Sequence, residues 1–104
     1  MKDEAVYNIP IKIAIALSRL LEKNKALQTE TNNENEIADS YNKICLNSGL
    51  RKATVSDIFN AKSTNVRAST LILVLKGMNY RFQDFAIIYD SLNKSDIDLF
   101  LKKK

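Results

Sequence analysis

Turn-forming residues are scarce in this chain, which contains two glycines and one proline among 104 residues. A β-sandwich or β-barrel needs many tight turns, and glycine and proline are the residues that most often form them. Hydrophobic residues make up 45% of the sequence, enough to form one core in a domain of this length. We therefore predict a single all-α domain, folded as a compact bundle of five to six helices.

The first predicted helix lies near the N-terminus. Isoleucines at alternate positions over residues 9–15 would fit a strand, but Leu17 and Leu21 continue the apolar pattern at helical spacing. Pro10 suits the first turn of a helix, because its missing N–H has no intrahelical partner there. We therefore predict a helix over residues 10–24.

The spacing of apolar residues also divides the rest of the chain into predicted helices and loops. Residues 25–35 are mostly polar and predict a loop. Helical spacing returns over residues 36–60, which we expect to contain two helices. Two more are predicted over residues 69–92, although the apolar run Leu71–Leu75 fits a buried strand equally well by periodicity. A short helix and a lysine-rich tail are predicted over residues 95–104.

The segment Tyr41–Asn60 has the pattern of a helix-turn-helix. This motif needs a small residue where its helices meet, a turn residue that tolerates positive φ, and apolar side chains on the inner face of its second helix. Cys45, Gly49 and Val55 meet these requirements at matching spacing. The other predicted core positions of the motif are apolar: Ile44, Leu50 and Ile58.

The similarity extends beyond those positions. Over residues 40–85 the chain resembles the Cro and lambda-repressor-like helix-turn-helix DNA-binding family, also called the xenobiotic-response-element (XRE) family. The runs that carry the resemblance are Ser48–Leu50, Thr54–Ser56, Ile58–Lys62, Ser69–Leu71 and Asp84–Phe85. It implies a lambda-repressor-like bundle that is helical at Leu71–Leu75. Tyr41 stands where the family often has glutamine, and Ala61 where it often has glycine.

The resemblance also implies which side chains meet double-stranded DNA. The helix Arg51–Asn60 would enter the major groove. Its candidates for reading bases are Arg51, Lys52, Ala53, Ser56 and Asp57. The candidates for phosphate contact are Tyr41, Lys43, Asn60, Lys62 and Arg67. For Arg51 and Lys52 the alternatives are solvated surface charge or phosphate contact without base choice. For Asp57 they are a charge that points to solvent or an ion pair with Lys62, and for Tyr41 packing against Ile37 and Ile44.

The composition argues against several other classes of protein. Without histidine, and with its one cysteine, Cys45, expected in the core, the chain lacks the usual acid–base, nucleophilic and zinc-binding groups. We therefore expect no enzyme, metal or cofactor. A single cysteine excludes an intramolecular disulfide. No apolar run is long enough to span a bilayer and no signal-like segment begins the chain, so we expect a cytoplasmic location.

These observations together predict a sequence-specific transcriptional regulator, a repressor, that binds double-stranded DNA. The net charge of +4 agrees with a polyanionic partner. We expect a homodimer, with its interface in the segment Phe82–Leu101. One alternative is an antitoxin with a partner toxin, and another is a protein-interaction module that kept the fold without binding DNA.

Overall fold

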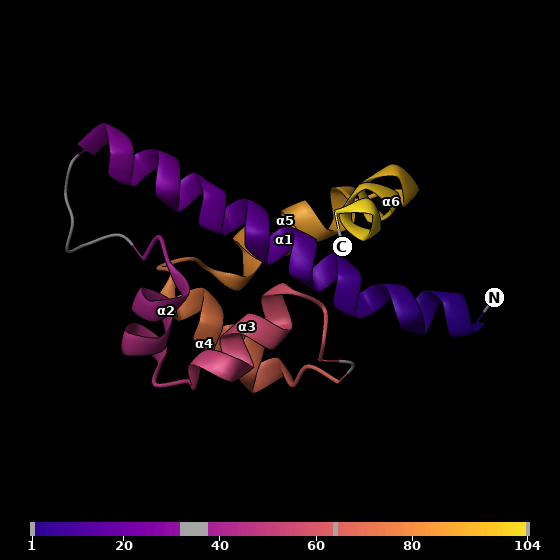
Figure 1. Ribbon diagram of the computed structural model, residues 1–104, viewed down its shortest axis with the longest axis horizontal. Coiled ribbons are helices and arrows are strands. Elements are labelled where there is room, and N and C mark those ends of the chain that lie inside the picture. Colours follow the sequence, from indigo (N-terminus) through magenta and orange to yellow (C-terminus); the bar gives the residue numbers. More distant parts are fainter. Residues whose placement is uncertain (1, 32–37, 64, 104) are drawn as a thin grey trace.

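The structure, a computed structural model, describes residues 2–31, 38–63 and 65–103. These residues form six α-helices and no strand (Figure 1). The helices are α1 (Lys2–Thr31), α2 (Tyr41–Ser48), α3 (Lys52–Phe59), α4 (Ala68–Gly77), α5 (Phe82–Ser91) and α6 (Lys94–Lys102). The all-α prediction is confirmed, and the ambiguous run Leu71–Leu75 is helical because it lies within α4. None of the described helices has both the length and the apolar composition needed to cross a membrane.

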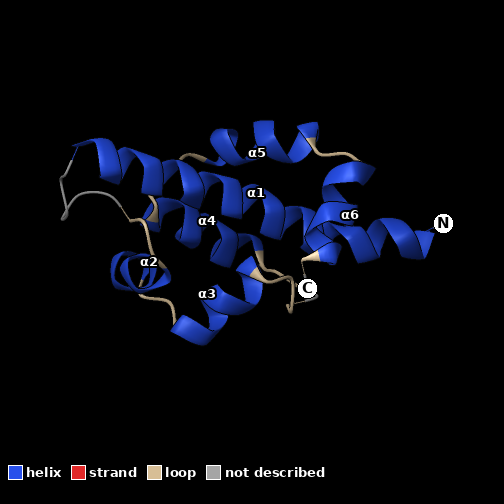
Figure 2. Cartoon of the chain, turned by 45° about the horizontal axis from the view of Figure 1, so that its top comes forward, coloured by secondary structure: helices blue, strands red, loops and turns tan. Residues whose placement is uncertain are grey.

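The long helix α1 is the axis around which the others are arranged. Its 30 residues run along the longest dimension of the molecule, which measures 45 Å. In Figure 1, α2, α3 and α4 lie on one side of α1, and α5 and α6 lie on the other. The view in Figure 2 keeps α5 on the side of α1 away from α2 and α3.

The position of α1 between two groups of helices explains its unusual pattern of apolar residues. Every side chain from Ile13 to Leu17 is buried, so this stretch faces the core on all sides. The isoleucines that alternate in the sequence are therefore not the mark of a strand. They belong to a helix that is covered on opposite faces.

The predicted ends of the first helix were wrong. The helix begins at Lys2, so Pro10 lies inside it and not in its first turn, although proline removes one intrahelical hydrogen bond. It also continues to Thr31, through much of the predicted loop. Residues 25–31 include lysine, alanine, leucine, glutamine and glutamate, which favour helix, and no glycine or proline to end it. Residues 32–35 of that loop lie outside the described residues.

The predicted start of the second helix, at residue 36, was also too early. The start near Glu36 lies outside the described residues, but residues 38–40 are not helical and α2 begins at Tyr41. Ser40 is its N-cap, and the Ser40 hydroxyl accepts a hydrogen bond from the backbone N–H of Lys43 at 3.2 Å. This bond satisfies one of the free donors at the helix N-terminus, so the helix begins there.

Asn24 is the one buried polar residue that the structure records among its described residues. Its side-chain N–H groups donate to the carbonyl oxygens of Ala38, at 2.9 Å, and Met78, at 3.2 Å. Its side-chain oxygen accepts from the Tyr80 hydroxyl at 2.8 Å. Burial, and secondly the Asp84 carboxylate, raise the pKa of Tyr80, which keeps this donor protonated. These bonds join α1 to the approach to α2 and to the end of α4.

Gly77 allows α2 and α4 to approach closely. A Cβ atom at this position would lie 3.1 Å from the carbonyl oxygen of Ile44 and 3.3 Å from the Cβ of Ser48. The amide of Asn47 also donates to the Gly77 carbonyl at 2.9 Å. Any side chain at position 77 would therefore push α2 away from α4, and α2 in turn positions α3.

Candidate nucleic-acid interface

The turn between α2 and α3 is built on Gly49. This residue has φ of 79°, in the left-handed region that glycine adopts without steric cost, and its N–H donates to the Cys45 carbonyl at 2.8 Å. The positive φ predicted for Gly49 is confirmed. The N–H of Leu50 donates to the Ser48 hydroxyl at 3.2 Å, which fixes the chain direction just before α3 begins at Lys52.

The inner face of the α2–α3 pair packs into the core. Ile44 and Val55 are fully buried and Ile58 is nearly so. Cys45 and Leu50 are partly buried against the same core, and the Cys45 thiol is not in a disulfide. Tyr41 and Phe59 join the two helices through their rings, whose centroids lie 5.0 Å apart. This packing fixes the orientation of α3, and its remaining side faces outward.

That outward side carries the residues predicted to read bases. Arg51, Lys52, Ala53 and Asp57 are exposed, and Ser56 is partly exposed. Arg51 is the N-cap residue of α3, but its side chain makes no capping hydrogen bond. Within the described part of the chain, Asp57 forms no ion pair, so the predicted alternative pair with Lys62 is not found. The contact between these two residues is a backbone bond from the Lys62 N–H to the Asp57 carbonyl, at 2.8 Å.

The residues predicted to contact phosphates fall into two groups. Lys62 and Arg67 are exposed in the connection that follows α3. The other three make intramolecular contacts. The Lys43 ammonium group pairs with Asp39 at 3.0 Å, and the Asn60 amide donates to the Ser56 carbonyl at 2.8 Å. The Tyr41 ring packs on Phe59, as described above; Ile37, one of its predicted neighbours, lies outside the described residues.

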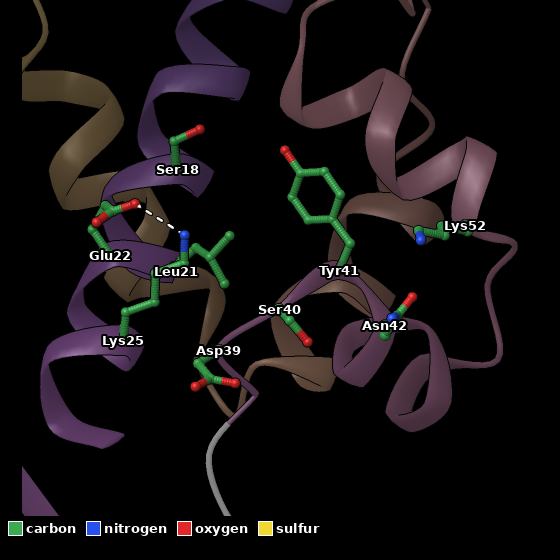
Figure 3. A pocket seen from close by; sticks show the side chains of 9 residues that line it. All are labelled: Ser18, Leu21, Glu22, Lys25, Asp39, Ser40, Tyr41, Asn42 and Lys52. Atoms are coloured by element: carbon green, nitrogen blue, oxygen red, sulfur yellow. Dashed lines mark hydrogen bonds and ion pairs between the residues drawn. The ribbon is translucent and has the colours of Figure 1, made fainter. Parts of the chain in front are cut away.

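Two surface hollows each contain two of the residues predicted to contact DNA. One lies where α1 meets the starts of α2 and α3, and Tyr41 and Lys52 both line it (Figure 3). Its other charged residues are Glu22, Lys25 and Asp39, and Lys25 lies 3.4 Å from Glu22. The second hollow contains both Asp57 and Arg67. The first hollow therefore brings together residues of α1, α2 and α3 that are widely separated in the sequence.

Two asparagines that line these hollows were not predicted from the sequence. Asn42 lines the first hollow from the opening turn of α2, and Asn65 lines the second. Asparagine side chains both donate and accept hydrogen bonds, so they suit contacts with phosphates and base edges. The position of Asn42 beside Tyr41 in the first turn of a helix was a signal available in the sequence. Asn65 lies in a connection whose path the sequence did not predict.

The end of α3 adopts a Schellman motif. The Ala61 N–H donates to the Ile58 carbonyl at 3.3 Å, and the Lys62 N–H donates to the Asp57 carbonyl. Ala61 itself has φ of 58°, a left-handed conformation that glycine normally occupies. The chain therefore leaves the helix sharply, and Lys62 follows directly after the turn.

Comparison of the chain with protein-family models, with curated proteins and with solved structures finds no match. Its function must therefore be inferred from its own residues. Among the described residues, no group of three or more side chains is arranged to hold a metal ion.

Proposed function

We propose that the chain binds double-stranded DNA in a sequence-specific manner and regulates transcription, as a repressor. In this proposal α2 and α3 are a helix-turn-helix of the lambda-repressor-like type, and α3 enters the major groove. The observation that carries the proposal is the division of α3 into a buried inner face and an uncovered outer face. A helix that is packed on one side and exposed on the other can insert its exposed side into a DNA groove.

The charges around α3 support the same proposal. Arg51 and Lys52 at the N-terminal end of the helix can donate to guanine O6 and N7 in the major groove. Lys62 and Arg67 would contact the sugar-phosphate backbone and set the position of the protein on the duplex. The first hollow, with the opening turn of α2 and Lys52, suits a further phosphate, because helix N-termini attract anions.

Asp57 has a separate role in this proposal. A carboxylate near phosphates weakens affinity for any DNA, unless it accepts a hydrogen bond from a base such as cytosine, through its N4 amino group. Asp57 is exposed and has no ion-pair partner among the residues that the structure describes, so it is available for such a bond. Its presence would therefore increase the difference in affinity between the correct site and other sequences.

Selection from a random duplex library at moderate salt tests the proposal. We expect enrichment of one sequence in inverted repeat, since family members bind near-palindromic sites as symmetric dimers. The variant Arg51→Ala should enrich the same sequence with one base pair in each half-site no longer specified. Lys76→Ala is the matched control, because Lys76 is exposed in the last turn of α4 and lines neither hollow. Failure to enrich any sequence would refute specific DNA binding.

The alternative is a protein-interaction module of the same fold. It is favoured by one observation, the exposed Asp57 in the middle of the outer face, which repels phosphates. An antitoxin is a narrower form of the main proposal, since it would bind both an operator and a toxin. A chain that enriches no duplex but still requires Arg51 for capture of a protein would support the interaction module.

A further inference from the structure

The C-terminal helix α6 is attached to α1 without burying any of its own residues. Ile97 and Phe100 are only partly buried against the core. The Arg19 guanidinium group of α1 lies 2.8 Å from the Asp96 carboxylate of α6 and joins the two helices at the surface. As a result, α6 protrudes from the surface of α1, and a groove lies between the two helices.

The groove between α1 and α6 has apolar residues on both walls. Ile15 and Ala26 line it from α1, and Leu99 and Phe100 line it from α6. Leu99 is 59% exposed, although leucine is usually buried. On α1 the lining extends over residues 15–26, which corresponds to about 16 Å of helix. A groove between two helices, with apolar residues on both walls, can bind the apolar face of a third helix.

The charges at the rim of this groove are predominantly positive. Its two carboxylates are both engaged, Asp96 with Arg19 and Glu22 with Lys25. Lys23 and Lys103 also line the groove, are exposed, and have no ion-pair partner in the described part of the chain. A ligand that fits the groove would therefore gain from negative charge beside its apolar surface.

We propose that the groove between α1 and α6 binds an amphipathic helix of another protein, with acidic residues flanking its apolar face. The apolar face would cover Leu99, and the acidic residues would lie near Lys23 and Lys103. A second copy of this chain placed groove to groove would add two more lysines without ion-pair partners among the described residues and no free carboxylate, which disfavours it. In Figure 1, α6 and α3 lie on opposite sides of α1. No residue of α3 lines the groove, although Ser18 and Glu22 of α1 line both the groove and the first hollow. A peptide in the groove needs no contact with α3, so the proposal does not depend on DNA binding.

A pair of synthetic peptides tests this proposal with the full chain. Each forms about four helical turns with leucines along one face. One has glutamates flanking the leucines and the other has lysines at the same positions. Fluorescence anisotropy should show binding of the acidic peptide, weakening as salt is added, and at least roughly tenfold weaker binding of the basic peptide.

Substitutions in the chain test whether the acidic peptide binds in the groove between α1 and α6. Leu99→Glu should weaken the acidic peptide roughly tenfold or more, because it places a charge where the leucines pack. Leu46→Glu is the matched control, since Leu46 is 83% exposed on α2, outside the groove, and this variant should bind normally. The double variant Lys23→Glu and Lys103→Glu should reverse the preference, so that the basic peptide binds better.

Three results would overturn the proposal. The first is equal binding of the two peptides, or binding of neither. The second is an unchanged affinity in Leu99→Glu. The third is a dimer of the chain in sedimentation that Leu99→Glu dissociates and that excludes the acidic peptide, which would make a second copy the occupant. Arg51→Ala, a change at the start of α3 and outside the groove, should bind the acidic peptide normally, which separates failure here from failure of DNA binding.

Discussion

Ala61 carries a backbone conformation that alanine rarely adopts. Its φ of 58° costs an L-amino acid roughly 1–2 kcal/mol, part of which glycine would recover. We expect Ala61→Gly to raise the free energy of unfolding by up to about 1 kcal/mol, as measured by urea denaturation. Ala53→Gly, an exposed position within α3, should lower it by about the same amount. Two changes of the same sign would contradict this account of Ala61.

Two kinds of basic residue should behave differently on DNA. Arg51→Ala should relax specificity at one base pair, at a cost of roughly 1–3 kcal/mol, because it removes a base contact. Lys62→Ala or Arg67→Ala should weaken binding to all sequences and lower the salt dependence by about one phosphate contact each. Titrations of the selected site and a scrambled site at several salt concentrations would distinguish them. If both groups changed only the general affinity, the assignment of Arg51 would be wrong.

The end of α1 is joined to other elements through Asn24. Asn24→Leu would leave the Tyr80 hydroxyl and two carbonyl groups without their partner, and we expect a loss of about 2–4 kcal/mol in the free energy of unfolding. Tyr80→Phe removes one of these bonds and should cost about 1 kcal/mol. The double variant should lose less than the sum of the two, because they share a bond. Additive losses in urea denaturation would show that the Asn24–Tyr80 bond contributes nothing.

The attachment of α6 should depend on pH. The Asn93 backbone N–H, and secondly the Arg19 side chain, hold the pKa of Asp96 below its ordinary value of 3.8. The stability from this carboxylate is therefore present above that value and is lost as the pH falls through the lower pKa of the folded protein. Hydrogen exchange should show α6 opening in acid, and Asp96→Asn should show the same opening at neutral pH. Asp98→Asn is the matched control; an equal effect of both would contradict the role of Asp96.

At the scale of the whole molecule, the proposed homodimer would use the segment Phe82–Leu101, through its α5 part, which leaves the groove between α1 and α6 to the acidic helix. Ile87 is 62% exposed on α5 and is our choice for its central contact. Sedimentation should show a dimer that Ile87→Glu dissociates, with weaker binding to an inverted repeat and little change at a single half-site. Leu46→Glu is again the control. A monomer at high concentration, even with DNA present, would remove this interface.

The sequence by itself determined the features that depend on neighbouring residues. Helices appear where apolar residues recur at spacings of three and four, and the turn at Gly49 appears where a residue must tolerate positive φ. The burial of Ile44, Val55 and Ile58 followed from the same local pattern. Of the five residues that the resemblance implied would read bases, four are exposed and Ser56 is partly exposed.

Tertiary structure alone decided the features that join distant residues. Asn24 finds partners 14, 54 and 56 positions away, and Arg19 pairs with a residue 77 positions away. The burial of residues 13–17 of α1 on all sides and the close approach at Gly77 arise in the same way. Local patterns specify which residues seek burial or hydrogen bonds, but the partners are fixed only when the helices pack.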